Sequence, residues 1–165
     1  MTFGQRLTGV LKLQPSTFEE IEGNPSANGQ ALAVVVIASL AAGIGAGLIG
    51  GPVSLLQGTL AALIGWLMWA GATYLIGARL LPEPGTRTDM GELLRVIGFS
   101  YAPNLFAVFA FIPFVGGVVR VVVAFWLLAA TVIAVRQALD YRSTPRAAAV
   151  VLIGWLLFVV ITWLA

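Results

Sequence analysis

The sequence predicts an all-α membrane protein, a five-helix transmembrane bundle with a short amphipathic N-terminal helix. Three observations support this fold class: the hydropathy of the whole chain, the length of its apolar stretches and the placement of its basic residues. Hydrophobic residues make up 59% of the 165 residues and charged residues only 10%, and the mean hydropathy is +0.98. Because soluble domains carry about a quarter charged residues, a water-soluble core of this size could not bury so much apolar surface.

Five apolar stretches are long enough to cross a bilayer, whose hydrocarbon core of about 30 Å takes about 20 helical residues. Only Gly51 and Pro52 separate the first two stretches, which predicts a tight hairpin between antiparallel neighbours. No stretch is left over for a soluble domain. The membrane domain is therefore expected to cover residues 30–165, with spans at about 30–50, 53–81, 92–111, 118–135 and 147–163.

Residues 1–29 are expected to form a cytoplasmic segment that begins with an amphipathic helix. Phe3, Leu7 and Val10 recur at helical spacing with polar residues between them. This pattern is typical of a helix that lies on a membrane surface. A secretory signal peptide is the alternative, but polar residues interrupt the apolar stretch and no small-residue cleavage site follows it.

A second short helix is predicted after Pro15, which is expected to end the first. Ser16 and Glu19 have the spacing of a capping box, in which a hydroxyl and a carboxylate accept hydrogen bonds from exposed backbone N–H groups at a helix start. A polar turn over residues 24–29 then leads into the first span.

The basic residues predict the orientation of the chain, because Lys and Arg in short loops favour the cytoplasmic side. Eight of the nine fall on one predicted side, and only Arg120 falls on the other. The sequence therefore predicts a multi-pass protein of the cytoplasmic (inner) membrane, with the N-terminus cytoplasmic and the C-terminus external. The eight residues are Arg6, Lys12, Arg79, Arg87, Arg95, Arg136, Arg142 and Arg146.

The composition excludes several kinds of chemistry. The chain has no cysteine and no histidine, which removes disulfides, thiolate and imidazole catalysis and most zinc, haem or iron–sulfur ligation. No catalytic residue, cofactor or metal site is predicted, so we do not expect an enzyme. A formal charge of +2 with scattered basic residues predicts no nucleic-acid partner. The stretch GAGLIG at 45–50 matches a dinucleotide fingerprint, but it lies within an apolar span and no strand precedes it.

Small residues recur every four positions in and after the first span, at Ser39, Gly43, Gly47 and Gly51. Such spacing is typical of a helix that a neighbouring helix approaches closely. The neighbour can belong to the same chain or to a second copy, and the pattern does not distinguish the two.

The third span contains a group of residues that could form a polar cavity or contact lipid. Pro103 interrupts the helical hydrogen bonds there, and Ser100, Tyr101 and Asn104 lie beside it. The freed carbonyl groups could instead be satisfied by adjacent helices. Arg120, near the outer end of the fourth span, is expected to anchor the helix on phospholipid phosphate, with a ligand or ion role as the alternative.

Four segments, in this order, resemble a bacterial member of the YIP family, the Ypt/Rab-GTPase-interacting membrane proteins. They are LQPSTFEEI at 13–21, GELLRVIGFSYAP at 91–103, IPFVGG at 112–117 and FWLLAATVIAVRQALDYRSTPRAAAV at 125–150. Phe99 takes the place of the tyrosine in the family's Gly-Tyr-x-x-x-Pro stretch. The resemblance implies a membrane protein with five spans and a non-catalytic interaction role.

The same resemblance bears on partners. Eukaryotic members bind small GTPases partly through a longer cytosolic region and carry an Asp-Leu-Tyr-Gly-Pro motif. This chain has about 29 residues there and no counterpart of the motif, which argues against a small GTPase partner. We therefore expect an interaction or scaffold component that contacts membrane lipids and other membrane proteins or itself. The alternatives are a transporter or channel for a lipid or small solute, and an accessory subunit of a larger membrane complex.

Overall fold

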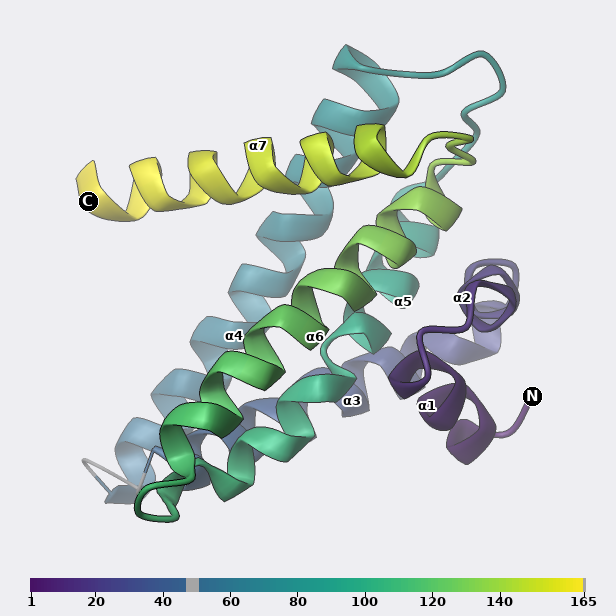
Figure 1. Ribbon diagram of the computed structural model, residues 1–165. Helices are drawn as coiled ribbons and strands as arrows, with labels where there is room; N and C mark the ends of the chain where they lie inside the picture. Colours follow the sequence, from purple (N-terminus) through teal and green to yellow (C-terminus); the bar gives the residue numbers. More distant parts are fainter. Residues whose placement is uncertain (47–50, 165) are drawn as a thin grey trace.

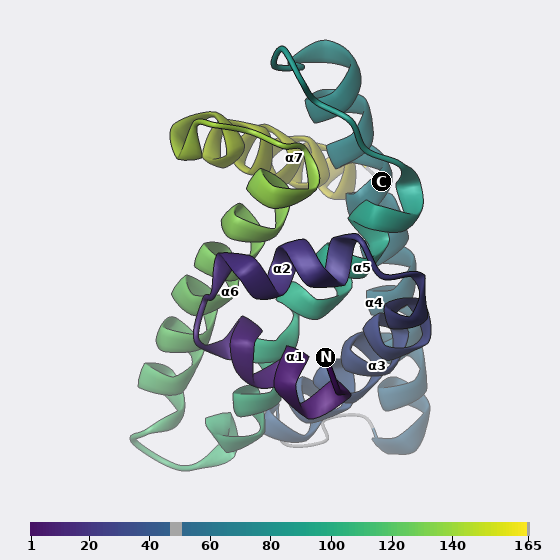
Figure 2. The same cartoon turned by 90° about the vertical axis from the view of Figure 1, so that its right-hand side faces the viewer.

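The protein is a bundle of helices with a pair of short helices on one side and an apolar helix crossing it on the other (Figures 1 and 2). The computed structural model describes residues 1–46 and 51–164, with the side chains of that range except at 158, 159 and 161–164. Within this range every regular element is helical, which confirms the predicted fold class. The α-helices are α1 (Phe3–Leu11), α2 (Pro15–Glu22), α3 (Asn28–Gly45), α4 (Gly51–Thr73), α5 (Met90–Ser100), α6 (Gly116–Ala138) and α7 (Thr144–Leu164).

Four segments of the described chain are long and apolar enough to cross a membrane: Pro25–Gly45, Gly51–Leu80, Met90–Phe111 and Gly116–Ala138. They correspond to the first four predicted spans, and the apolar helix α7 corresponds to the fifth. The protein is therefore a multi-pass membrane protein. Figure 1 shows α7 crossing α4 and extending away from the bundle on the side opposite α1 and α2.

The first two helices form an N-terminal hairpin, defined here as residues 1–23. Thr2 caps α1 through a capping box with Gln5. The box predicted at Ser16 and Glu19 is wrong: Gln14 is the N-cap of α2 and makes no side-chain capping bond, and Pro15 is the first helical residue. Proline suits that position because its missing N–H would have no partner there and its φ is already helical, so Pro15 starts a helix where the sequence predicted a stop.

The N-terminal hairpin packs on the protein, an arrangement that the amphipathic pattern alone did not predict. Val10, Phe18 and Ile21 are completely buried, and the rings of Phe3 and Phe99 lie 6.2 Å apart. The amphipathic pattern shows that α1 needs an apolar partner, but not whether that partner is lipid or protein. In Figure 2 the hairpin covers the side of the bundle between α6 and α3.

The second span differs from the prediction at both ends. Gly51 and Pro52, expected as a tight turn, are the first residues of α4. At its other end α4 continues as a π-helix, η2 (Tyr74–Leu80). The Tyr141 hydroxyl lies 2.8 Å from the carbonyl oxygen of Gly77 and 2.6 Å from that of Leu81, and it thus satisfies carbonyl groups at the end of this wider helix.

The third span is two helices rather than one. Asp89 and Glu92 form a capping box that starts α5, and beyond Tyr101 the chain continues as a 3₁₀-helix, η3 (Ala102–Phe111), with Pro103 in its first turn. Pro103 has no N–H to donate to the preceding turn, so the α-helical hydrogen bonds end there. The change of helix type is the break that the sequence predicted at this proline.

Glycines let the backbones approach closely on the side of α3. A Cβ atom at Gly45 would overlap the carbonyl group of Ala107 in η3, and one at Gly98 would lie 2.9 Å from the Cβ of Ala31 and 3.2 Å from the ring of Trp66. Helices α3, α5 and η3 therefore pack with their backbones close together. This contact depends on the absence of side chains, as is common where helices pack within membranes.

Candidate functional site

Arg6 holds the N-terminal hairpin together from a completely enclosed position. Its side chain is 1% exposed, and its guanidinium donates to both carboxylate oxygens of Glu20, at 2.8 and 2.7 Å, and to Oε1 of Gln30 at 2.7 Å. Hydrogen bonds from Arg6 lower the pKa of the Glu20 carboxyl to about 2. Because a buried charge is tolerated only with such partners, these bonds fix α1, α2 and the start of α3 in one arrangement.

Arg95 fastens the same hairpin from the other end. It lies on α5 and is nearly buried, and it donates to the carbonyl oxygens of Ile21 and Glu22, the last turn of α2, and to Oδ1 of Asn28 at 3.2 Å. Carbonyl groups at a helix C-terminus lack partners within the helix and carry partial negative charge. We call Arg6, Glu20, Gln30 and Arg95 the hairpin clamp.

The surroundings of Glu22 disfavour the charged form of its carboxyl group. Burial raises the pKa of its carboxyl to about 8, and the carboxylates of Asp140, Glu92 and Glu19 act in the same direction, while Arg95 opposes them. The Glu22 side chain, two residues after Glu20 of the hairpin clamp, therefore favours its neutral form at pH 7.

The outer face of the hairpin is polar. Gln5, Thr8, Lys12, Ser16 and Glu19 are exposed on it. Hydrocarbon does not solvate such groups well. The hairpin is therefore a pair of short helices with a polar outer face, fixed to the side of the bundle.

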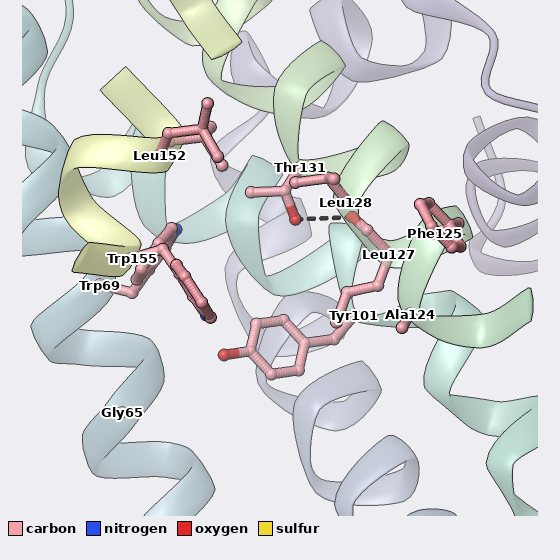
Figure 3. A pocket seen from close by; sticks show the side chains of 11 residues that line it. Gly65, Trp69, Tyr101, Ala124, Phe125, Leu127, Leu128, Thr131, Leu152 and Trp155 are labelled. Atoms are coloured by element: carbon pink, nitrogen blue, oxygen red, sulfur yellow. Dashed lines mark hydrogen bonds between the residues drawn. The ribbon is translucent and has the colours of Figure 1, made fainter. Parts of the chain in front are cut away.

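A cavity of about 560 Å³ lies on the α7 side of the bundle. Its walls come from four parts of the chain, which Figure 3 shows converging beneath α7. Apolar side chains provide most of its surface. The lining residues are Gly65 and Trp69 of α4, Tyr101 between α5 and η3, Ala124, Phe125, Leu127, Leu128 and Thr131 of α6, and Val151, Leu152 and Trp155 of α7.

The polar groups of this cavity are of two kinds. The Thr131 hydroxyl donates to the Leu127 carbonyl at 2.8 Å and lies 3.3 Å from Ser100 Oγ, so it is already satisfied. The Tyr101 hydroxyl and the indole N–H groups of Trp69 and Trp155 make no hydrogen bond within the described residues and are accessible rather than fully buried. By contrast, Trp66 and Trp126 donate to the carbonyl oxygens of Leu94 and Leu11, both at 3.0 Å.

The structure separates the residues that the sequence grouped around Pro103. Tyr101 lines the cavity, and in Figure 3 its hydroxyl points toward the part lined by Trp69 and Trp155. Ser100 is buried and donates to the Ile97 carbonyl at 2.7 Å, and Pro103 is buried as well. Asn104 is half-buried outside the cavity lining. Arg120 is exposed in the first turns of α6, away from this group.

The four small residues predicted to pack helices lie in different settings. Gly43 faces the Leu55 side chain of α4, within the same chain. The Ser39 hydroxyl donates to the Val35 carbonyl at 2.6 Å, and Gly51 has open space beside it. Gly47 lies outside the described residues, and so does most of the matched dinucleotide pattern.

A family model described as the Yip1 domain matches residues 8–165. The chain belongs to the Yip1 domain family. The search of curated proteins found no match, and the search of solved structures found none either. The matched range includes α2, Glu20, Gln30, Arg95 and the whole cavity, whereas Arg6 and the start of α1 precede it.

Sequence reasoning did not identify the hairpin clamp or the cavity. It counted Arg6 and Arg95 only as cations that orient the chain. A signal was present, because Arg6 lies between Phe3 and Val10 on the apolar face of its helix, and Arg95 interrupts the apolar run LLRVIGF. A charge on an apolar face predicts a buried partner.

Proposed function

We propose that this Yip1 domain protein is a non-catalytic interaction component of the cytoplasmic membrane. Its N-terminal hairpin would serve as a preformed docking surface for a partner protein on the cytoplasmic side. The observation that carries this proposal is the hairpin clamp, which holds two short helices in one position through Arg6 and Arg95. A surface already ordered before contact loses less conformational entropy on binding.

The polar outer face favours a protein partner over a membrane anchor. A helix that anchors on lipid exposes its apolar side chains to the bilayer, whereas Val10, Phe18 and Ile21 point into the protein here. The exposed Lys12 and Glu19 carry opposite charges, which suits the mixed polar surface of a folded protein.

The position of the exposed arginines supports the proposed orientation. Arg79 lies at the end of η2, Arg87 and Arg142 lie in the loops after η2 and before α7, and Arg146 lies in the first turn of α7. The main-chain N–H of Arg142 donates to Glu83 at 3.0 Å and so joins the two loops. Arg120 lies near the start of α6, whereas Arg142 follows the end of the same helix. Under the positive-inside rule the end with four exposed arginines is cytoplasmic.

Cysteine labelling tests the orientation directly, since the chain has no cysteine of its own. Thr8→Cys is exposed on the hairpin and Phe114→Cys replaces a fully exposed residue in the turn before α6. A membrane-impermeant maleimide should label Phe114→Cys in intact spheroplasts and Thr8→Cys only in inverted vesicles. The reverse pattern would disprove a cytoplasmic hairpin.

A photo-crosslinking amino acid tests the partner. Placed at Thr8 or Ser16 in cells, it should give a discrete adduct with a second protein. The matched control at Leu56, which is exposed on α4, should give none of the same mass. Arg95→Met should remove the adduct, because it detaches the surface without altering the crosslinking position. Recovery of no second protein at either hairpin position would contradict the proposed function.

A further inference from the structure

The cavity beneath α7 is partly open. Side chains at its rim are largely exposed, with Phe125 at 69% and Trp155 at 55%, whereas Val151 and Thr131 in its wall are buried. In a membrane protein such exposed apolar side chains contact lipid. A molecule could therefore enter this cavity from the hydrocarbon without crossing water.

The polar groups of the cavity select the chemistry of an occupant. Tyr101, Trp69 and Trp155 offer donors without acceptors in the described protein, and no charged side chain lines the cavity. Donors in an apolar setting favour an occupant with a neutral acceptor such as a carbonyl oxygen. A phosphate headgroup or a free carboxylate would find no counter-charge there.

The size of the cavity favours a chain rather than a helix. A volume of about 560 Å³ lies within the range of about 300–1,000 Å³ typical of small-molecule sites. A spanning helix about 10 Å wide and 30 Å long would occupy roughly 2,400 Å³. A whole spanning helix therefore does not fit inside this cavity, whereas an acyl chain does.

We propose that the cavity binds one acyl chain of an ester-linked membrane lipid, with the ester carbonyl accepting a hydrogen bond from the Tyr101 hydroxyl. The aromatic side chains of Trp69, Phe125 and Trp155 would enclose the chain, and the lipid headgroup would stay outside. This inference is independent of the hairpin and of its partner.

Two glycines of α4 provide a matched pair of variants. Gly65 lines the cavity and Gly58 lies two turns earlier on the same helix, and a Cβ atom at either position would meet nothing within 4 Å. Gly65→Leu therefore fills the cavity without a backbone clash, and Gly58→Leu makes the same change outside it. Leucine favours a helix over glycine at both positions, so neither variant should unfold. Tyr101→Phe removes only the hydroxyl.

The test uses the full chain in vesicles of phosphatidylethanolamine and phosphatidylglycerol that contain phosphatidylglycerol with a diazirine in one acyl chain. After irradiation, mass spectrometry compares labelling of the cavity residues with labelling of the exposed α4 residues Val53, Leu56 and Leu60. We expect labelling concentrated in the cavity of the wild type and of Gly58→Leu, and reduced to the level of the exposed residues in Gly65→Leu. Tyr101→Phe should lower cavity labelling about three- to tenfold, as loss of one hydrogen bond predicts.

An ether-linked analogue of the same lipid has the same chains but no ester carbonyl, so it distinguishes the contribution of the carbonyl from that of the chain. Its cavity labelling should be lower than that of the ester lipid in the wild type and unchanged by Tyr101→Phe. Even labelling of all exposed apolar residues, full cavity labelling in Gly65→Leu, or equal labelling by ester and ether lipids would overturn the proposal. Displacement of the label by a short-chain ubiquinone, at concentrations where unlabelled ester lipid has no effect, would assign the cavity to a ring carbonyl instead.

Discussion

The hairpin side and the α7 side of this protein are held together in different ways. On the hairpin side two enclosed arginines, each with several acceptors, join α1, α2, α3 and α5, and glycines bring α3 against η3. On the α7 side contacts are apolar and leave a cavity of about 560 Å³. Directional bonds to a buried charge specify one arrangement, whereas apolar contacts inside a membrane specify less, because lipid is as good a neighbour as leucine.

Substitution of Arg6 should have the largest effect of the variants considered, on the stability of the hairpin side. Arg6→Met leaves Gln30 without its donor and leaves Glu20 with only the Met1 amino group and Asn24 as donors. Loss of the three hydrogen bonds made by the Arg6 guanidinium is expected to destabilise by about 3 kcal/mol. We expect the hairpin to open while the bundle persists. Trypsin cleavage after Lys12 should then accelerate at least about tenfold, and cleavage after Arg142 should not change.

The double variant Arg6→Met/Glu20→Leu serves as the control for this prediction. It removes both charges, so it should recover part of the resistance to trypsin. Unchanged cleavage after Lys12 in the single variant would show that the clamp does not hold the hairpin.

A methyl group at Gly45 should have the next largest effect. The Cβ of Gly45→Ala would overlap the Ala107 carbonyl group of η3, so the two backbones must separate, at a cost of about 2–3 kcal/mol. The midpoint of thermal unfolding in detergent should fall clearly. Gly65→Ala, a matched change on the cavity side, should not lower it. Equal effects of the two substitutions on the unfolding midpoint would contradict the inferred difference in packing between the hairpin side and the α7 side.

Glu22 predicts how the hairpin side responds to pH. Its folded-state pKa of about 8 lies above the unfolded value of 4.5, so the folded state binds the proton more tightly and loses stability as pH rises from about 4.5 to 8. Glu20, whose pKa is lowered to about 2, acts in the opposite sense, and its contribution is lost only as pH falls from about 4.5 to 2.

Glu22→Gln should therefore flatten the decline of the unfolding midpoint between pH 5 and pH 8 and raise the midpoint at pH 8. Glu19→Gln is the comparison variant: it removes a charge from an exposed position of α2 that is one of the smaller causes of the raised Glu22 pKa, so it should leave most of the decline in place. A decline as steep in Glu22→Gln as in the wild type would show that Glu22 is not its source.

The smallest effect is expected for Gly65→Ala on the cavity side. Alanine favours an α-helix over glycine by about 0.8–1.0 kcal/mol, and no atom lies near the new methyl group. The unfolding midpoint should rise slightly. A decrease would mean that the cavity is narrower than the structure shows.

Periodic and compositional features were predictable from the sequence. Apolar length located the five apolar helices to within a few residues, and Pro103 marked the change from α5 to η3. The helix at residues 15–22 was also expected, although its capping was not. These features depend on neighbours along the chain, which the sequence displays directly.

Contacts across long separations were not predictable in this way. Arg95 binds the end of α2 across more than 70 residues, and the indole of Trp126 binds Leu11 across more than 100. The sequence by itself determined that this chain crosses a membrane as helices, because apolar length and charge placement are local properties. Only the tertiary structure decided that Arg6 and Arg95 are buried and hydrogen-bonded rather than exposed on the surface, and that Tyr101 faces a cavity. Both outcomes depend on which helices, distant in the sequence, come together.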